Sequence, residues 1–173
     1  MRSSDRDDLA TLCRDITHSF VHLETRDAYG TEVELTHWAM WLRGESDDFA
    51  WLDWWLEMVR GHRAAGRSCR RLRVVSEPLS EYQRWVLTFT ELFVNAGEDV
   101  RYVPRPRLVS LALPGSGDFY VFDGRVAMFL HYTGNGINAS FEVSEDPNTV
   151  KPCMQSFEAA WNLATVFHDY RPA

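Results

Sequence analysis

The chain has 173 residues, of which 45% are hydrophobic and 25% charged, and its net charge at pH 7 is −7. These values are typical of a globular protein of one domain with its own core, and they exclude collagen-like, low-complexity and disulfide-scaffold chains. No apolar run approaches the roughly 20 residues that cross a bilayer. The polar start, residues 1–8, has no apolar signal-peptide region, so we expect a cytoplasmic protein without membrane contact.

The cysteines and histidines give no sign of a metal site. Cys13, Cys69 and Cys153 are far apart in the sequence, whereas a zinc site needs close pairs of ligands. We therefore expect free thiols in a reducing compartment. His18 and His22 have an i, i+4 metal-ligand spacing, but two lone histidines are more often surface or core residues. The sequence predicts neither a metal nor a cofactor.

The net charge is unevenly distributed along the chain. Residues 1–59 have a net charge of −8, residues 60–107 of +5 and residues 108–173 of −4. One interpretation is that the basic middle pairs with the acidic ends within the molecule. The other is an anion site for a phosphate-bearing small molecule. The overall acidity argues against direct nucleic-acid binding, which usually needs a basic domain.

The first part of the chain is predicted to be mainly helical. Residues 5–24 give a short helix and then a short strand or docking segment, and residues 31–43 give a second helix. Residues 49–65 form the next helix, because apolar residues recur there at i, i+3 and i+7. The tryptophans of these helices are interpreted mainly as core. Trp51 and Trp54 are the members expected in an exposed patch if the protein docks a partner.

The middle of the chain predicts a βαβ unit. Residues 70–76 alternate and end in β-branched residues, as a strand does. Residues 81–96 have a wide apolar helical face after Ser80, a good N-cap, and residues 99–103 form a second strand. A strand, a helix and a strand in this order make the two strands parallel.

The last part predicts an antiparallel meander and a closing helix. Residues 104–117 read as a loop with a short strand at 108–113. Three strands follow, at residues 118–122, 125–132 and 137–143. Asp123-Gly124 is a two-residue hairpin turn between the first two of them. A helix over residues 148–164 closes the fold, and the tail after Phe167 is expected to fray.

The predicted fold class is therefore α/β with a mixed sheet. A helical part, residues 1–67, packs on a sheet part, residues 68–173, within a single domain of residues 1–173. The sheet consists of the βαβ unit, at about 70–104, and the meander, at about 118–143.

The strongest candidate site lies where the two parallel strands end. Ligands of open parallel sheets bind at the carboxyl ends of the strands, and helix N-termini bind anions. Arginine binds phosphate or carboxylate through two parallel hydrogen bonds. The residues predicted to bind an anionic ligand there are Arg71, Arg73, Ser76, Glu77, Tyr82, Arg84, Arg101 and Arg105. In the alternative interpretation, Arg70 and Arg73 pair with acids of the chain such as Glu98.

A second candidate set lies on the meander. His131 is an acid/base candidate near neutral pH, or else a half-buried strand histidine. Asp118 and Asp123 are acids nearby, and Asp123 also reads as the hairpin residue. The sequence has no GxSxG, P-loop, GxGxxG or HExxH motif. No catalytic residue is therefore assigned.

Three segments resemble an uncharacterised actinobacterial domain family. Residues 71–82 read RLRVVSEPLSEY, residues 95–105 read NAGEDVRYVPR and residues 118–123 read DFYVFD. They resemble that family's R-R-x-R-V-V-S-E-P-L-S-x-Y, A-G-E-D-I-R-Y-L-P-R and D-F-W-x-F-D segments, with Tyr120 in the aromatic position. The resemblance covers most of residues 18–165. The preference for Arg over Lys is typical of a high-GC genome.

The resemblance implies a regulatory or signalling role rather than a reaction. Members of the family are often encoded beside helix-turn-helix regulators, which implies such a regulator as the protein partner. The βαβ unit with its aromatic strand and hairpin also resembles one half of the phospholipase D fold, whose hydrolase motif is H-x-K-x4-D. Here His131 is followed by Tyr132 and Thr133 with no Lys, so hydrolase chemistry would be lost.

Two functions follow from these patterns. The first is a non-enzymatic regulatory module that acts through a protein partner and senses an anionic small molecule. The second is an enzyme acting on a nucleotide or phosphorylated metabolite, with Ser76, Glu77, Asp123 and His131 as its polar groups. An enzyme requires these four residues to converge in one pocket.

Overall fold

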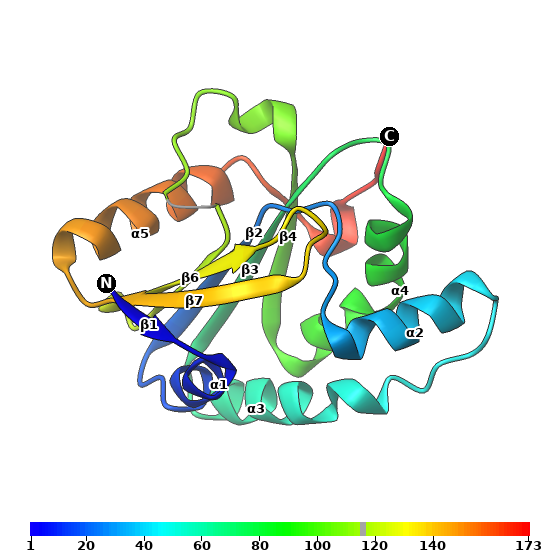
Figure 1. Cartoon of the computed structure of the whole chain (residues 1–173), viewed down its shortest axis with the longest axis horizontal. Helices are drawn as coiled ribbons and strands as arrows, with labels where there is room; N and C mark the ends of the chain where they lie inside the picture. The colour runs from blue at the N-terminus through cyan, green and yellow to red at the C-terminus, as the bar shows by residue number, and fades with distance from the viewer. Residues whose placement is uncertain (115–116) are drawn as a thin grey trace.

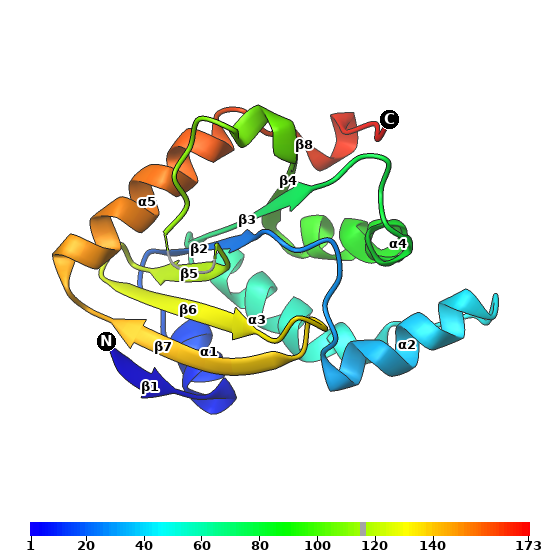
Figure 2. The same cartoon turned by 45° about the horizontal axis from the view of Figure 1, so that its top comes forward.

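The chain folds into one mixed sheet with helices on both faces (Figure 1, Figure 2). The structure, a computed structural model, describes residues 1–114 and 117–173, so residues 115 and 116 of the predicted loop lie outside it. In the described part the sheet has eight strands in the order β1-β7-β6-β5-β2-β3-β4-β8. This architecture confirms the predicted α/β class.

The elements have the following bounds. The strands are β1 (Arg2–Ser4), β2 (Ser19–Glu24), β3 (Ser68–Val75), β4 (Glu98–Pro104), β5 (Phe119–Phe122), β6 (Val126–Tyr132), β7 (Asn138–Ser144) and β8 (Thr165–Val166). The helices are α1 (Arg6–Arg14), α2 (Glu32–Leu42), α3 (Asp53–Ala64), α4 (Glu81–Ala96) and α5 (Pro147–Trp161). Short 3-10 turns are η1 (Ala50–Leu52), η2 (Arg105–Leu108) and η3 (Phe167–Asp169).

The first third of the chain contributes more to the sheet than its helical pattern predicts. β2 lies in the middle of the sheet, parallel to β3 on one side and antiparallel to β5 on the other. It thereby joins the predicted βαβ unit, whose strands β3 and β4 are parallel, to the predicted meander of β5, β6 and β7. β1 also joins the sheet, antiparallel to β7.

Each face of the sheet buries its own apolar cluster. Helices α1, α3 and α4 cover one face, where Trp85 and Phe89 of α4 pack with Phe20 and other residues of the strands. Helix α5 covers the other face, and its Phe157 packs with Leu72 of β3. Helix α2 extends away from the sheet (Figure 1), and each of its residues keeps part of its surface exposed.

Local signals in the sequence set several boundaries. Ser80 caps α4, because its Oγ accepts a hydrogen bond from the Gln83 amide at 3.1 Å. Gly97 ends the same helix with a φ of 117°, in the left-handed region that favours glycine. Asp123 and Gly124 have positive φ values of 51° and 64°, as both central residues of a type I′ hairpin turn do.

The strand predicted at residues 108–113 is wrong. The chain forms the 3-10 turn η2 instead, with Pro106 in its first residues, and Val109 and Ser110 continue in a turn. Proline suits this place because its φ is fixed near the helical value and it has no N–H to donate.

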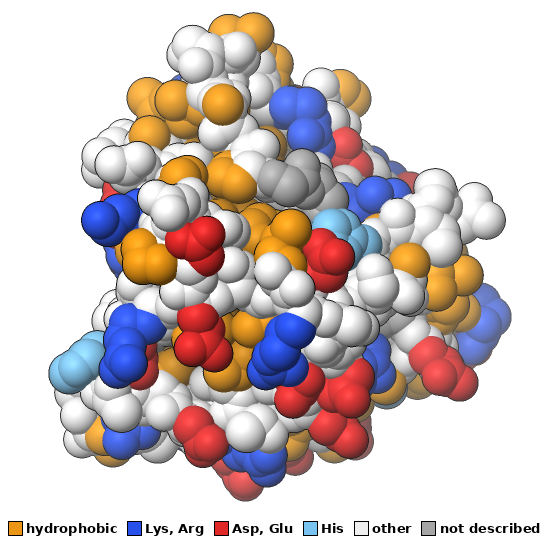
Figure 3. Space-filling view, turned by 60° about the vertical axis from the view of Figure 1, so that its left-hand side comes forward, with side chains coloured by type: hydrophobic (Ala, Val, Ile, Leu, Met, Phe, Trp, Pro, Cys, Tyr) orange, Lys and Arg blue, Asp and Glu red, His pale blue; other side chains and the backbone are white. Residues whose placement is uncertain are grey.

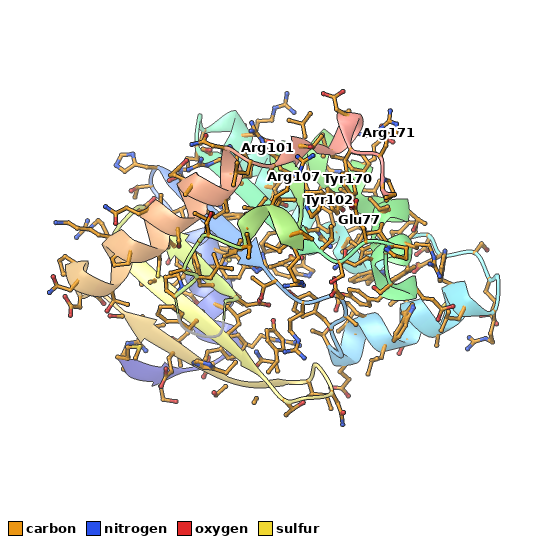
Figure 4. All side chains as sticks on the ribbon, turned by 90° about the horizontal axis from the view of Figure 1, so that it is seen from above. Glu77, Arg101, Tyr102, Arg107, Tyr170 and Arg171 are labelled. Atoms are coloured by element: carbon orange, nitrogen blue, oxygen red, sulfur yellow. The ribbon has the colours of Figure 1, made fainter. Side chains whose placement is uncertain are left out.

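The prediction that the tail after Phe167 frays is also wrong. Tyr170 is only 7% exposed. Its ring stacks on that of Tyr102 in β4, with ring centroids 4.7 Å apart and planes within 5°. Its hydroxyl donates to Glu77 Oε1 at 2.8 Å, and Figure 4 shows the three side chains together. A buried aromatic ring thus fixes the tail beside the end of β3.

We expect Tyr170→Ala to lower the free energy of unfolding by about 3 kcal/mol, the usual cost of truncating a buried aromatic side chain. Tyr170→Phe should cost about 1 kcal/mol, because it removes the hydrogen bond to Glu77 alone. Urea titration measures both. An unchanged midpoint for Tyr170→Ala would contradict the docked tail.

Candidate functional site

Charged and polar side chains lie along the two central parallel strands, β2 and β3, on the face of the sheet that α1, α3 and α4 cover. His22 and Glu24 belong to β2, and Arg71 and Arg73 belong to β3. His22 is in register with Arg71, and Glu24 with Arg73. Alternate residues of a strand share a face, so all four lie under α3 and α4, and each is at most 7% exposed. They form a polar patch inside an otherwise apolar layer.

Arg71 is the centre of a buried ion network. Its Nε donates to Glu98 Oε1 at 2.8 Å, and its Nη1 donates to Glu24 Oε1. Trp55 Nε1 donates to the other oxygen of Glu98 at 3.0 Å. The Arg71 guanidinium carbon also lies 5.2 Å from the Trp55 ring centroid and 5.0 Å from that of Phe93. Two carboxylates and two aromatic rings thus surround this cation.

Arg73 and His22 are less completely paired. Arg73 Nη1 lies 3.4 Å from Glu24 Oε2, whereas its buried Nε has no hydrogen-bond partner among the described residues. The His22 ring stacks on Tyr120, with centroids 3.7 Å apart. His22 Nδ1 lies 3.4 Å from Glu24 Oε1 and has no hydrogen bond in the described part of the chain. Unpaired buried polar atoms are costly, so they call for a ligand, ion or water.

The charge states of this patch follow from its surroundings. Burial alone would raise the pKa of Glu24, but Arg73 and Arg71 outweigh it and bring that pKa down to about 2. Glu24 is therefore a carboxylate at neutral pH. Burial lowers the pKa of His22 well below its usual value, so its imidazole is neutral.

The polar patch forms part of the wall of a cavity of about 490 Å³. This volume lies within the range of about 300–1,000 Å³ that is typical of small-molecule sites. The other walls are largely aromatic and include Trp51, Trp55, Tyr82, Phe89, Tyr120 and Tyr132. Val33 of α2 and Trp54 of α3 also line the cavity and are 46% and 57% exposed. Arg6 and Asp7 of α1 are further exposed residues of its lining, so the cavity is open to solvent where these helices meet it. Three predicted site residues, Arg71, Arg73 and Tyr82, therefore meet here rather than at the strand ends.

The carboxyl ends of the parallel strands bring Ser76 and Arg105 together, as the sequence predicts, but around a carboxylate of the chain itself. Asp27 accepts from the Ser76 amide at 2.7 Å and from the Ser76 hydroxyl at 2.6 Å. Arg105 Nη2 lies 3.3 Å from Asp27 Oδ2, and Arg105 Nε donates to Ser76 Oγ at 3.2 Å. Burial raises the pKa of Asp27, but the hydrogen bonds from Ser76 and the charge of Arg105 outweigh it and lower that pKa.

The other predicted strand-end residues have separate surroundings. Glu77 accepts from Tyr170, as described above. Arg84 is exposed, with Nη2 3.8 Å from Glu81, and donates to the Leu79 carbonyl at 3.0 Å. The Arg101 guanidinium carbon lies 4.2 Å from the ring centroid of Trp161 in α5, on the opposite face of the sheet from the cavity.

The candidates on the meander are dispersed. Asp123 accepts the amides of Thr17, His18 and Ser19 at 2.8–2.9 Å, which holds the hairpin against the start of β2. Burial would raise its pKa, but these amides lower it to about 2. His131 Nε2 lies 3.1 Å from Glu142 Oε2 of the neighbouring strand.

Of Ser76, Glu77, Asp123 and His131, only Asp123 lines one of the three main cavities in the described part of the chain, so these cavities do not bring the four residues together. Asp118, the remaining acid of the meander set, accepts from the Thr25 amide at 2.8 Å and from the Tyr29 hydroxyl at 2.6 Å.

Sequence reasoning named Glu98 as a partner of Arg70 and Arg73, but Glu98 pairs with Arg71, and Arg70 pairs with Glu158 instead. It missed Glu24 and His22. Glu24 and His22 lie in a segment whose apolar neighbours Val21 and Leu23 alternate with them, and that alternation was the available signal. The hydrogen bond from Trp55 to Glu98 could not be predicted from the sequence, because the two residues are 43 positions apart.

The described residues hold no group of three or more His, Cys, Asp or Glu side chains placed to bind a metal ion. None of the described helices combines the length and apolarity that a membrane span requires.

We expect the two buried arginines to differ in their effect on stability. Arg71→Met should lower the free energy of unfolding by about 3–5 kcal/mol, because it leaves two buried carboxylates short of a cation. Arg73→Met should cost less, since Glu24 keeps its bond to Arg71. Exposed Arg84→Met is the control, with an expected cost of about 0–1 kcal/mol. Urea titration measures these losses. Equal losses of unfolding free energy for Arg71→Met and Arg73→Met would contradict the predicted difference between the two arginines.

Comparisons with known proteins identify a structure of similar fold and a family to which the chain belongs. No protein of curated function has significant sequence similarity to the chain. Among solved structures, it resembles a phospholipase D family member, Nuc from Salmonella typhimurium, with a TM-score of 0.56 and 10% identity over 97% of this chain and 91% of that chain. At this identity the likeness concerns the fold alone. A family model, Domain of unknown function (DUF6879), matches residues 7–172. The chain therefore belongs to this family of domains of unknown function.

Proposed function

We propose that the chain is a non-enzymatic regulatory module that senses a small molecule bound in the aromatic cavity over β2 and β3. The observation that carries the proposal is the combination of an open cavity of about 490 Å³ with a buried arginine, Arg73, whose Nε is unpaired among the described residues. A pocket with apolar walls and a few placed polar groups is the usual form of a ligand site.

Several observations favour sensing over catalysis. The four polar residues of the enzyme alternative are not brought together by the three main cavities in the described part of the chain, whereas a catalytic site needs them to converge. Burial raises the pKa of the cavity hydroxyls of Tyr29 and Tyr82 well above the usual value, so neither is a ready base. The single lysine, Lys151, follows no histidine at the H-x-K spacing, so the phospholipase D motif is lacking.

We further propose that the module acts in the cytoplasm through a protein partner, a helix-turn-helix regulator. The support is the regulatory context that the sequence resemblance implies, together with three buried free thiols, which suit a reducing compartment. Figure 3 shows acidic and basic side chains interspersed on one face of the molecule rather than gathered in a basic patch. Such a surface favours a protein over a nucleic acid as the partner.

A thermal-shift screen of small metabolites tests the sensing proposal. A ligand at a hundred times its Kd adds about 2.7 kcal/mol of stability, which raises the Tm of a protein of this size by about 5–10 °C. Val33→Trp, at the cavity mouth, should abolish the shift. Leu42→Trp is the matched control, because Leu42 is also an exposed apolar residue of α2 but does not line the cavity. Equal shifts in both variants would place the ligand elsewhere.

Co-purification with a regulator encoded beside the gene tests the partner proposal. We expect a stable complex and a change in the regulator's DNA affinity when the module is added. If the module stays separate on gel filtration and leaves DNA binding unchanged, the partner is not this regulator.

A further inference from the structure

We propose that the cavity takes one class of ligand: a mostly apolar, ring-containing molecule that ends in a single oxyanion, which binds the Nε edge of Arg73. This inference rests on the proposed function and adds the chemistry that the cavity selects. It differs from the strand-end anion site that the sequence predicts, where Asp27 already holds Ser76 and Arg105.

The head of the ligand is specified by Arg73. Its side chain is 5% exposed, lines the cavity and contacts Glu24 through Nη1 at 3.4 Å. Its Nε has no hydrogen bond among the described residues. A guanidinium donates through parallel N–H groups along one edge, a geometry that fits the two oxygens of a carboxylate or phosphate. Arg73 is therefore a cavity-lining side chain whose buried Nε has no acceptor among the described residues.

The neighbouring arginine does not offer the same site. Arg71 already donates through Nε to Glu98 and through Nη1 to Glu24. Its guanidinium also lies near the rings of Trp55 and Phe93. One cation of the patch is thus committed to holding the sheet, and the other remains for a ligand. His22 Nδ1, which has no hydrogen bond in the described part of the chain, is a second polar atom at this end of the cavity.

The buried and partly buried acids of the cavity wall do not favour a cationic ligand, and the third lining acid, Asp7 of α1, is exposed and lies next to Arg6, which also lines the cavity. Glu24 is shared by Arg71 and Arg73. Glu34, on α2, accepts a hydrogen bond from Thr31, and burial raises its pKa. An ammonium head would meet two arginines whose counter-ions are already engaged, whereas an oxyanion would complete the pairing of Arg73.

The body of the ligand is specified by the rings above this patch. The ring of Trp51 stacks on that of Trp85, with planes within 15°, and the Tyr120 ring lies on His22. Trp51, Tyr120 and Phe89 all line the cavity. The Trp51 ring also stacks on His37, with planes within 22°, so these rings are held in place by protein neighbours. Aromatic walls of this kind favour a ligand with an apolar, ring-containing body.

A matched compound series tests the inference. Three ring systems, 2-naphthyl, 4-biphenylyl and 3-indolyl, are each measured as the carboxylic acid, the primary carboxamide and the aminomethyl compound, by ligand-observed NMR with competition. We expect the acid of at least one ring system to bind at least tenfold tighter than its amide, and the amine to bind weakest. Arg73→Gln should reduce the affinity of the acid to that of the amide and leave the amide unchanged.

Two further variants separate binding from folding. Arg73→Lys keeps the charge but not the planar donor edge, so the acid should bind with intermediate affinity. Arg84 does not line the cavity, so the Arg84→Gln variant should bind the acid with the same affinity as the unmodified chain. Thermal melts of all three variants confirm that each is folded before binding is measured.

The outcomes distinguish the two proposals. If an amide or amine binds as tightly as its acid, or if Arg73→Gln leaves the acid's affinity unchanged, the oxyanion inference is wrong while the cavity still binds ligands. If no compound of any ring system binds, the sensing function itself is contradicted, and the oxyanion inference fails with it.

Discussion

The burial of the Arg71 guanidinium among the three parallel strands β2, β3 and β4 of the mixed sheet is the constraint on which the rest of the structure depends. A buried cation needs carboxylates that reach it with good geometry, because its desolvation is costly. Those carboxylates come from both neighbouring strands, Glu24 of β2 and Glu98 of β4. Trp55 then connects α3 to the same network through Glu98. One side chain thereby links three strands and a helix, and the cavity lies directly beside it.

The two arginines of β3 share one alternating pattern but differ in how completely they are paired. Both point to the same face, because they are two residues apart in a strand. Arg71 is surrounded by partners, whereas Arg73 shares a single carboxylate with it. The sequence RLRVV contains this pair without distinguishing its members. The difference arises from Glu98 and Trp55, which the fold places beside Arg71.

Local signals predicted much of the fold, and non-local pairing accounts for what they missed. The bounds of α4 follow from Ser80 and Gly97, and the hairpin follows from Asp123-Gly124, because each signal acts within a few residues. The site required partners from distant segments. Asp27 reaches Ser76 across 49 positions, and it occupies the place where the sequence predicted an external anion. A single sequence gives no measure of such distances, so Arg71 and Arg73 were predicted at the strand ends instead of beneath the helices.

The edges of the sheet have a consequence for how a protein partner can bind. The outermost strands, β1 and β8, are only three and two residues long. Short edge strands offer few unpaired backbone groups, which limits both edge-to-edge aggregation and the addition of a strand from another chain. Recognition by side chains of helices and loops therefore remains the accessible route. Helix α2, which extends from the body beside the cavity mouth, is the element through which ligand occupancy would reach such a surface.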